Sequence, residues 1–331
     1  MEQLIQGASM PLVVLMLIVG FVFLIKGADF FVEGSSSIAK KLQVPSIIIG
    51  LTIVAMGTSL PETAVSVTAS MVNNNALAVS NVIGSNIFNL MFVIGVCSIL
   101  TPIAVQRETV VRDIPLSVIC ALLLAGLGIL AVGDKEIYIL GHLDGVIFLV
   151  LFAGYIILMI RSALKARAEG KEVAIEGEED LKVLSYPKSI LCIVGGAIAI
   201  AIGGDLTVDT ASRIAVELGM SQTLVGLTIV SIGTSLPELV TSIVAARKNE
   251  VDMAVGNAVG SNIFNILMVL GIASAINPIG LLTENLIDIM ILVGFSLLVW
   301  AFAATKRKIT RKEGLAMVVL YLVYAIYIIL R

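Results

Sequence analysis

Long apolar runs recur along the whole chain and are separated by short polar stretches. Each run holds about 20 residues, which is enough for an α-helix to cross a hydrocarbon core of ~30 Å. The pattern therefore predicts an all-α polytopic membrane protein with ten transmembrane helices. We expect the spans at residues 11–32, 44–70, 76–99, 113–132, 141–160, 189–216, 222–246, 252–276, 284–304 and 312–330.

A polar motif interrupts the second apolar run and returns in the seventh. The sequence GTSLPE occupies residues 57–62 and recurs unchanged at residues 233–238, 176 positions later. The same offset aligns GSNIFN at residues 84–89 with residues 260–265, without a gap. An internal duplication explains this match. Because each half holds five spans, an odd number, the second half should enter the membrane from the opposite side, as in many secondary transporters.

The only long polar stretch lies between the halves, at residues 161–188. It mixes acidic and basic residues and has too little apolar content to build a core. We therefore expect a cytoplasmic linker, flexible or partly helical, between a first repeat at residues 1–160 and a second, inverted repeat at residues 189–331. The alternative is a calcium-sensing role for the acidic residues, although the ligand spacing of an EF-hand loop is absent.

Composition excludes a soluble protein and argues against histidine-based catalysis. Of the 331 residues, 58% are hydrophobic and 14% are charged, and the mean hydropathy is +1.07. The three cysteines lie in apolar spans without metal-ligand spacing, so we expect no disulfide. His142 is the only histidine, so a catalytic or metal-binding site built from histidines is not expected. The first span lacks a basic segment and a cleavage site, so we do not interpret it as a signal peptide.

Basic residues predict the orientation. With ten spans, the loops after odd-numbered spans share one face. By the positive-inside rule these loops are cytoplasmic, and both termini lie outside. We expect a multi-pass protein of the cell membrane that works as a monomer and binds no nucleic acid. The predicted cytoplasmic face holds 17 of the 21 basic residues, namely Lys40, Lys41, Arg107, Arg112, Arg161, Lys165, Arg167, Lys171, Lys182, Lys188, Arg247, Lys248, Lys306, Arg307, Lys308, Arg311 and Lys312.

Two glutamates, Glu62 and Glu238, lie at equivalent depths inside apolar spans. A charge near the bilayer centre costs about 2.5–3.5 kcal/mol on insertion scales, so each glutamate needs a partner that offsets this cost. No basic residue lies near the middle of a span except Lys26, and its counterpart in the second half is Ile202. A bound cation is the remaining partner.

The polar residues near the glutamates offer only hard oxygen ligands. Calcium takes six to eight such oxygens, and sodium accepts the same ones, whereas zinc or copper favours imidazole or thiolate. Glycine and proline should partly unwind both motif helices and release backbone carbonyls. For the serines and asparagines, interhelical hydrogen bonding is the open alternative. The candidate ligands are the side chains of Glu62, Thr58, Ser59, Ser85, Asn89, Glu238, Thr234, Ser235, Ser261 and Asn265, and the carbonyls of Ala55 and Ser231.

The doubled GTSLPE and GSNIFN motifs resemble the α-repeats of the sodium/calcium exchangers within the cation/calcium exchanger superfamily. The resemblance covers nearly the whole chain outside the linker. It implies a sodium/calcium antiporter without an organic cofactor, in which spans 1 and 6 slide past a rigid core. It also implies four ion sites at the midplane, with Glu62 and Glu238 shared by calcium and sodium. The carbonyls of Ala55 and Ser231 would serve the outer and inner sodium positions.

One departure from the family pattern concerns Asn265. Several members, including potassium-dependent ones, carry Asp at this position, so the formal charge of the site here is −2 rather than −3. A proton-coupled or potassium-dependent calcium antiporter therefore stays open as an alternative. Two alternatives from other classes are a cation channel and an intramembrane aspartyl protease that uses Asp29 and Asp205. The duplication is expected to place these aspartates on opposite sides of the membrane.

Overall fold

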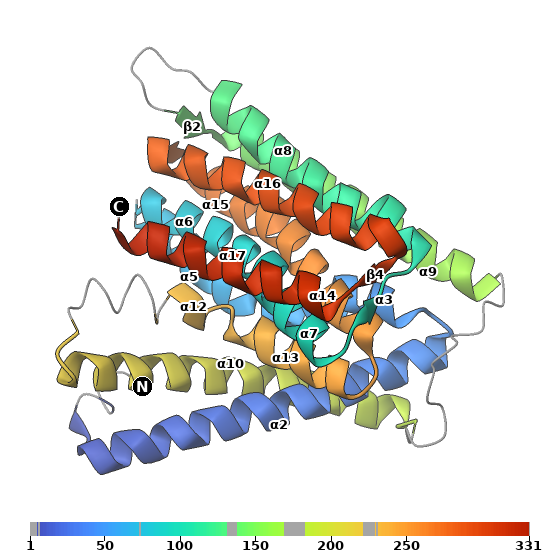
Figure 1. Cartoon of the computed structure of the whole chain (residues 1–331), viewed down its shortest axis with the longest axis horizontal. Helices are drawn as coiled ribbons and strands as arrows, with labels where there is room; N and C mark the ends of the chain where they lie inside the picture. Colours follow the sequence, from blue (N-terminus) through green and yellow to red (C-terminus); the bar gives the residue numbers. More distant parts are fainter. Residues whose placement is uncertain are drawn as a thin grey trace.

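The computed structural model of the chain is almost entirely helical (Figure 1). It describes every residue except 1–4, 6, 73, 131–137, 169–182, 221–228, 230 and 331. The first half contains α2 (Met10–Leu42), α3 (Ser46–Ile49), η1 (Gly50–Val54), α4 (Ala55–Thr58), α5 (Leu60–Met71), α6 (Asn75–Ile87), η2 (Phe88–Val93), α7 (Ile94–Leu100), β1 (Ile103–Ala104), η3 (Thr109–Asp113), α8 (Ile114–Leu130), β2 (Tyr138–Leu140) and α9 (His142–Ala168). The second half contains α10 (Tyr186–Glu217), α12 (Ser231–Gly233), α13 (Leu236–Arg247), α14 (Val251–Phe264), η5 (Asn265–Val269), α15 (Leu270–Ile276), β3 (Ile279–Leu281), α16 (Thr283–Lys306), β4 (Lys308–Ile309) and α17 (Arg311–Leu330). The predicted all-α membrane fold is confirmed.

Nine of the ten predicted spans can be followed in the described residues. Eight continuous helices are long and apolar enough to cross a membrane, and a ninth span is bent by 50° between Thr58 and Leu60. The remaining predicted span, at residues 222–246, lies partly outside the described residues. The predicted linker overlaps the end of α9 and the start of α10, and its residues 169–182 also lie outside the described part.

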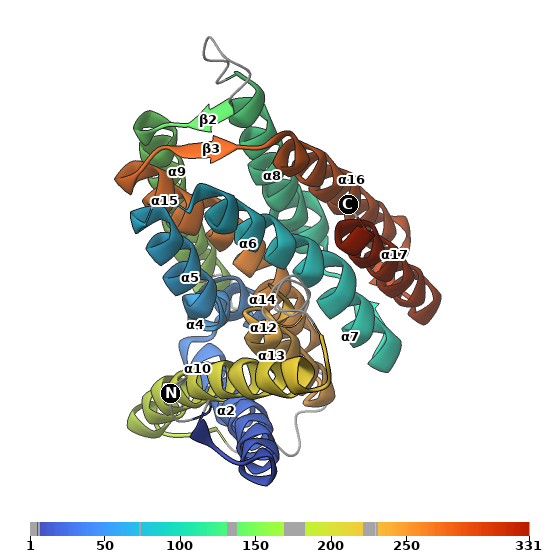
Figure 2. The same cartoon turned by 90° about the vertical axis from the view of Figure 1, so that its left-hand side faces the viewer.

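The helices α2 and α10 are the longest in the described part of the chain, with 33 and 32 residues. They lie antiparallel and side by side at one edge of the bundle (Figure 2). At 1.5 Å per residue each is roughly 50 Å long, which exceeds the hydrocarbon thickness and requires a tilt. The predicted end of the first span at residue 32 was therefore too early. The helix continues to Leu42 because its polar segment 35–37 is buried against the protein.

Small residues bring α2 and α10 into direct backbone contact. A Cβ atom placed on Gly196 would lie 2.7 Å from the carbonyl oxygen of Gly27 and 2.7 Å from the amide nitrogen of Phe31. One placed on Gly203 would lie 2.7 Å from the amide nitrogen of Leu24. Glycines at such positions let membrane helices approach closely.

The two halves interlock rather than form separate bodies. Strand β1 of the first half pairs with β4 of the second, and β3 of the second half pairs with β2 of the first. Helix α7 packs against α17, and α15 packs against α9, so these contacts also cross between halves. The repeat offset maps β1 onto β3 and α7 onto α15. The inverted repeat is therefore visible in the packing as well as in the sequence.

The close contact of α2 with α10 generates a stability prediction. Replacing Gly196→Val should force the helix backbones apart and lower the melting temperature of the detergent-solubilised protein by several degrees, because overpacking costs about 1–3 kcal/mol. The neighbouring Gly195 is exposed, and nothing lies within 4 Å of the position that a Cβ would take there. Gly195→Val is therefore the matched control and should melt like the unmodified protein. Equal melting of the two variants would contradict the contact.

Candidate metal-ion site

Both GTSLPE motifs lie at breaks in a membrane-spanning helix. The proline at the second position of α5 and of α13 has no N–H to donate, so the helix before it cannot continue with regular hydrogen bonds. The glycines of the motifs admit neighbouring side chains. A Cβ on Gly57 would lie 2.6 Å from the Phe31 ring, and one on Gly233 would lie 2.2 Å from Val208. The breaks thus lie directly beside α2 and α10.

Glu62 is fully buried in the first turn of α5. Its Oε1 accepts hydrogen bonds from the hydroxyl of Ser235 at 3.1 Å and from that of Ser85 at 3.3 Å. Its Oε2 has no hydrogen-bond partner among the described residues. Ser85 belongs to the same half as Glu62, and Ser235 belongs to the other.

Glu238 repeats this arrangement from the second half. It is fully buried, and its Oε1 accepts hydrogen bonds from Ser59 at 2.8 Å and from Ser261 at 3.4 Å. Its Oε2 also lacks a partner within the described part of the chain. Each glutamate is therefore held by one serine of its own half and one of the opposite half. The six side chains form a single cluster that neither repeat could build alone.

Two asparagines, each four residues after a serine of the cluster, carry further unpaired oxygens. Asn89 is buried, and neither its Oδ1 nor its Nδ2 has a described partner. Asn265 donates from Nδ2 to Ser85 Oγ at 3.2 Å and to Asn86 Oδ1 at 3.1 Å, whereas its own Oδ1 accepts no bond from a described residue. Buried polar atoms without partners are rare in folded proteins and call for an explanation.

A hard cation explains the unpaired oxygens. Carboxylate and amide oxygens are the ligands that calcium, and equally sodium, accept. The described residues contain no cluster of three or more His, Cys, Asp or Glu side chains arranged to hold a metal ion. The negative charge at this position thus comes from Glu62 and Glu238, and the other ligands are neutral. Hydroxyl and amide oxygens of this kind can replace part of the hydration that a cation loses on entering a buried site.

The sequence predicts that the backbone carbonyls of Ala55 and Ser231 are both released at the helix breaks, and the structure agrees with this for only one of them. The carbonyl of Ala55 is not released, because it accepts the N–H of Ser59 at 3.0 Å. In the second half, the N–H of Ser235 bonds the carbonyl of Ile232 at 3.1 Å instead, so the Ser231 carbonyl does not receive the equivalent bond. The expected release of the Ala55 carbonyl is thus wrong for this conformation. The hydrogen bond after α4 therefore spans four residues, as in a regular α-helix, whereas the equivalent hydrogen bond after α12 spans three.

Two asparagines that reach the motifs were not predicted from the sequence. Asn81 donates to Ser66 Oγ at 2.9 Å and to the backbone carbonyl of Glu62 at 3.4 Å. Its counterpart Asn257 donates to Ser242 Oγ at 3.0 Å and to the Glu238 carbonyl at 3.3 Å. The repeat offset maps one asparagine onto the other, and this signal could have identified both.

Another unpredicted pair joins the two halves at their centre. Asn86 donates from Nδ2 to the backbone carbonyl of Asn262 at 3.2 Å, and Asn262 donates to the carbonyl of Asn86 at 3.0 Å. The two residues occupy equivalent positions in the repeats, and both are buried. These reciprocal bonds fix α6 against α14, the helices that carry Ser85 and Ser261.

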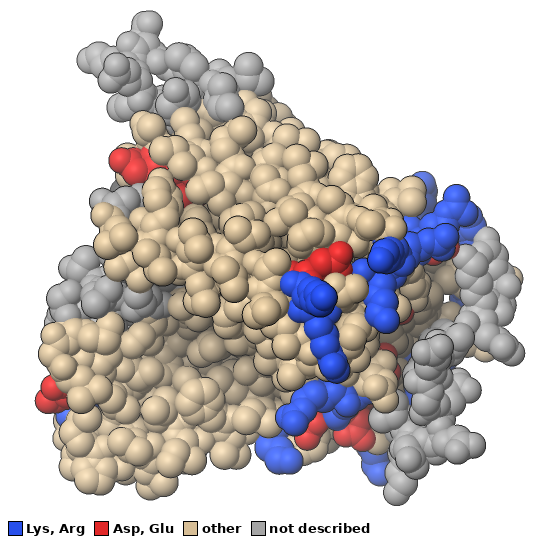
Figure 3. Space-filling model, viewed as in Figure 1, with Lys and Arg blue, Asp and Glu red and all other residues tan. Residues whose placement is uncertain are grey.

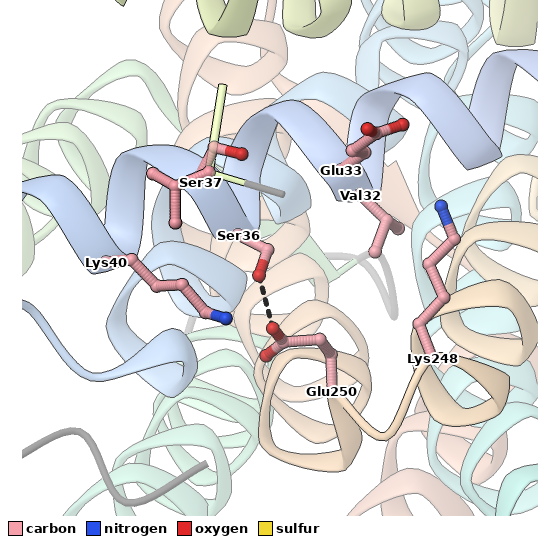
Figure 4. Close-up of a pocket in the computed structure, with 8 residues that line it drawn as sticks. Val32, Glu33, Ser36, Ser37, Lys40, Lys248 and Glu250 are labelled. Atoms are coloured by element: carbon pink, nitrogen blue, oxygen red, sulfur yellow. Dashed lines mark hydrogen bonds between the residues drawn. The ribbon is translucent and has the colours of Figure 1, made fainter. Parts of the chain in front are cut away.

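Polar contacts tie the end of α2 to the end of α13. Ser36 donates a hydrogen bond to Glu250, which is buried, and both residues line a small pocket with Lys40 and Lys248 (Figure 4). Lys248 Nζ lies 2.9 Å from Asp29 Oδ1 and also donates to the Asp29 carbonyl at 3.0 Å. These contacts close one side of the site, and we refer to the set Asp29, Ser36, Lys248 and Glu250 as the α2–α13 contact.

The opposite side has no equivalent of the α2–α13 contact among the described residues. The repeat offset maps Ser36 onto Ser212 and Glu250 onto Asn74, and the buried Ser212 hydroxyl has no described partner. Helix α2 packs along α13, but α10 makes no comparable packing with α5 in the described part. Accordingly, Leu60 at the start of α5 is 52% exposed, whereas its counterpart Leu236 is half-buried. The repeat is symmetric in sequence, and this conformation is not.

The structure does not bring Asp29 and Asp205 together. Because α2 and α10 are antiparallel and in contact at Gly27 with Gly196 and at Gly20 with Gly203, the two aspartates lie at different heights. Nine residues of helix, or roughly 13 Å, separate the level of Asp29 from that of Gly20. Asp29 is also paired with Lys248. The alternative of an aspartyl protease is therefore excluded, as the inverted duplication predicted.

Comparisons with known proteins agree on one family. The family model described as sodium/calcium exchanger protein matches residues 12–161 and 188–330. The sodium/calcium exchanger MaX1 of Methanosarcina acetivorans is 31% identical over 342 residues, which cover 94% of this chain and 97% of that protein. The inner membrane protein YrbG of Escherichia coli is 33% identical over 300 residues, with 88% and 90% of the two chains covered.

A solved structure resembles the whole fold. It is that of the sodium-calcium exchanger NCX_Mj, soaked with Na⁺ and Ca²⁺ in a study of extracellular ion exchange and binding-site occlusion. The TM-score is 0.79 at 33% sequence identity, and the match covers 94% of this chain and 97% of the other.

The geometry of the glutamates generates a binding prediction. Glu62→Gln and Glu238→Gln should each weaken Ca²⁺ binding by about 30- to 150-fold, because loss of one charge-assisted contact costs roughly 2–3 kcal/mol. Calorimetric titration of the detergent-solubilised protein measures this. Glu284→Gln removes the same charge at an exposed position of α16 and should bind Ca²⁺ normally. Near-normal binding by either site variant would contradict the assignment.

Proposed function

The chain belongs to the sodium/calcium exchanger protein family, and we propose that it is a secondary antiporter that exchanges sodium for calcium across the membrane. The single observation that carries this proposal is the buried pair of glutamates, each with one unpaired oxygen and each held by serines from both halves. A pair of negative charges inside a membrane protein requires a cation, and the surrounding ligands are all oxygens. An exchanger needs such a site to accept either ion in turn.

We propose that the twelve candidate residues line one cluster of ion sites, to which Ala55 contributes only the second lone pair of its carbonyl, because the first accepts the N–H of Ser59. Glu62 and Glu238 carry a formal charge of −2, which a single calcium ion compensates. Each sodium ion carries a single positive charge, so several sodium ions can bind to the same two carboxylates and to the neutral oxygens around them. The Ser231 carbonyl, which lacks the bond that Ala55 accepts, is the backbone oxygen most ready to bind an ion in this conformation.

We propose that the protein lies in the cell membrane with both termini outside. This orientation is supported by the basic residues, which gather at the end where α2 ends and α17 begins (Figure 3). The relative YrbG is named an inner membrane protein. The repeats at residues 1–160 and 189–331 would then form one transport unit. Because one chain supplies the serines for both glutamates, we propose that a monomer is sufficient.

This orientation gives the α2–α13 contact a role in alternating access. The contact would close the cytoplasmic side of the site, and the uncovered face of α5 would lie on the outer side. The conformation is then the one that exchanges ions with the outside. A slide of α2 and α10 past the rest of the bundle would break the α2–α13 contact and bring α10 toward α5. The close backbone contact between α2 and α10 would let the two helices move as one unit.

The proposed function is tested by calcium uptake into proteoliposomes that hold the purified protein. We expect Ca²⁺ uptake when Na⁺ is inside and absent outside, and no uptake when choline replaces Na⁺ or when only a proton gradient is imposed. Glu62→Gln in the same vesicles is the inactive control. Uptake that needs no counter-gradient would indicate a channel, and uptake driven by protons alone would indicate a different coupling ion.

A further prediction concerns potassium and Asn265. With a site charge of −2, one calcium ion leaves the loaded site neutral, and an added K⁺ would leave it at +1 in a poorly solvated cavity. Replacing K⁺ by choline at fixed ionic strength should therefore change sodium-driven Ca²⁺ uptake by less than about twofold. Asn265→Asp adds the missing negative charge, and uptake by this variant should become responsive to K⁺.

The control for this variant is Asn249→Asp, which adds the same charge in an exposed loop and should stay indifferent to K⁺. A clear potassium requirement in the unmodified protein would show that the charge count does not govern ion choice.

A further inference from the structure

Two buried asparagines connect each half of the chain to the other half's motif. Asn257 on α14 accepts a hydrogen bond from the hydroxyl of Thr58 at 3.0 Å. Asn81 on α6 accepts one from the hydroxyl of Thr234 at 3.2 Å. The repeat offset maps each asparagine onto the other and each threonine onto the other. The two bonds therefore form a crossed pair, in which the threonine of one repeat meets the asparagine of the other.

The orientation of both amides is determined by their remaining contacts. The oxygen and nitrogen of a carboxamide are similar in size, so the neighbours decide which is which. One end of Asn257 lies 3.3 Å from the backbone carbonyl of Glu238, and one end of Asn81 lies 3.4 Å from that of Glu62. A carbonyl can only accept, so the amide nitrogen must face it in both cases. The amide oxygen then faces the threonine, and because this oxygen cannot donate, the threonine must give its proton.

This direction of the bond matters because a hydroxyl has only one proton. Thr58 Oγ1 also lies 3.2 Å from the carbonyl of Val54 and 3.3 Å from that of Ala55. A threonine in a helix commonly donates its hydroxyl proton to a backbone carbonyl of the preceding turn. Thr58 also lies beside the carboxylate of Glu238, which would accept its proton strongly. Without Asn257, the proton would turn to one of these acceptors, and two of them, the Ala55 carbonyl and the Glu238 carboxylate, are candidate ligands of the cation.

We propose that Asn257 and Asn81 are positioning residues for the transported cation. Each takes the hydroxyl proton of the opposing threonine, which directs that proton away from the oxygens that a cation needs. In the first half, the second lone pair of the Ala55 carbonyl is spared as well, since its other one accepts the N–H of Ser59. The inference rests on the proposed function, because the cation is the one that the exchanger carries.

A purely structural role is the competing interpretation. Asn257 also donates to Ser242, and Asn81 also donates to Ser66, so either asparagine could simply hold its own helices together. The two roles differ in one respect. If the asparagine is only structural, its removal changes ion binding whether or not the threonine has a hydroxyl. If it is a positioning residue, its removal changes ion binding only when that hydroxyl is present.

A double-mutant cycle separates the two roles. The variants are Asn257→Ala, Thr58→Val and the double variant, and the readouts are the half-saturating Na⁺ concentration and the maximal rate of Ca²⁺ transport in proteoliposomes. We expect Asn257→Ala to raise the half-saturating Na⁺ concentration about three- to tenfold, roughly the loss of one hydrogen bond, and to change the maximal rate by less than about twofold. In the Thr58→Val background the same replacement should have no further effect.

The crossed geometry supplies a matched control within the chain. Asn257→Ala should keep its full effect in a Thr234→Val background, because Thr234 is paired with Asn81. Asn81→Ala should behave in the reverse manner and lose its effect only when Thr234 is replaced. An asparagine whose effect is the same in both threonine backgrounds would overturn the proposal, and so would an asparagine whose removal has no effect.

The same cycle is also measured as equilibrium Na⁺ and Ca²⁺ binding by calorimetry in detergent. This readout needs no transport, so it tests the asparagines even if the unmodified protein fails to exchange sodium for calcium. Failure of exchange alone would contradict the proposed function, whereas additive binding losses would contradict the positioning role. Size-exclusion profiles equal to that of the unmodified protein show that each variant is folded.

Discussion

The burial of two carboxylates inside the membrane is the constraint on which the rest of the structure depends. Glu62 and Glu238 are fully buried, and neither has a basic partner in the described residues that surround it. Serine hydroxyls satisfy one oxygen of each carboxylate, and a neutral donor cannot remove the charge. The other oxygen is left for a cation. Most of the surrounding architecture can be understood as a way to hold these two groups close together without a permanent counter-ion.

The inverted duplication solves this problem by interlocking two copies. Each glutamate takes one serine from its own repeat and one from the other, and each motif threonine meets an asparagine of the opposite repeat. The reciprocal bonds between Asn86 and Asn262 hold the centre. The site is therefore shared by both repeats, and each glutamate depends on a serine of the other repeat.

Asymmetry within the symmetric frame provides the direction of opening. The α2–α13 contact uses an ion pair and a buried carboxylate, whereas the equivalent positions on the other side are Asp205 with Val72 and Ser212 with Asn74. One side is therefore held by charged groups, and the equivalent positions on the other side lack these partners. Two conformations related by the repeat need not have equal free energy, because their closing contacts differ in chemistry.

The sequence by itself determined the helical membrane fold, the inverted repeat and the two glutamates, because hydropathy, a constant repeat offset and the cost of a buried charge are local or periodic signals. It also identified the serines that bond the two glutamates, but it missed Asn81 and Asn257. Only the tertiary structure decided which of them meet, since the crossing of Ser59 to Glu238 and of Thr58 to Asn257 depends on how the halves interlock. The length of α2 and the α2–α13 contact were likewise decided there, because both result from packing between segments that are distant in sequence.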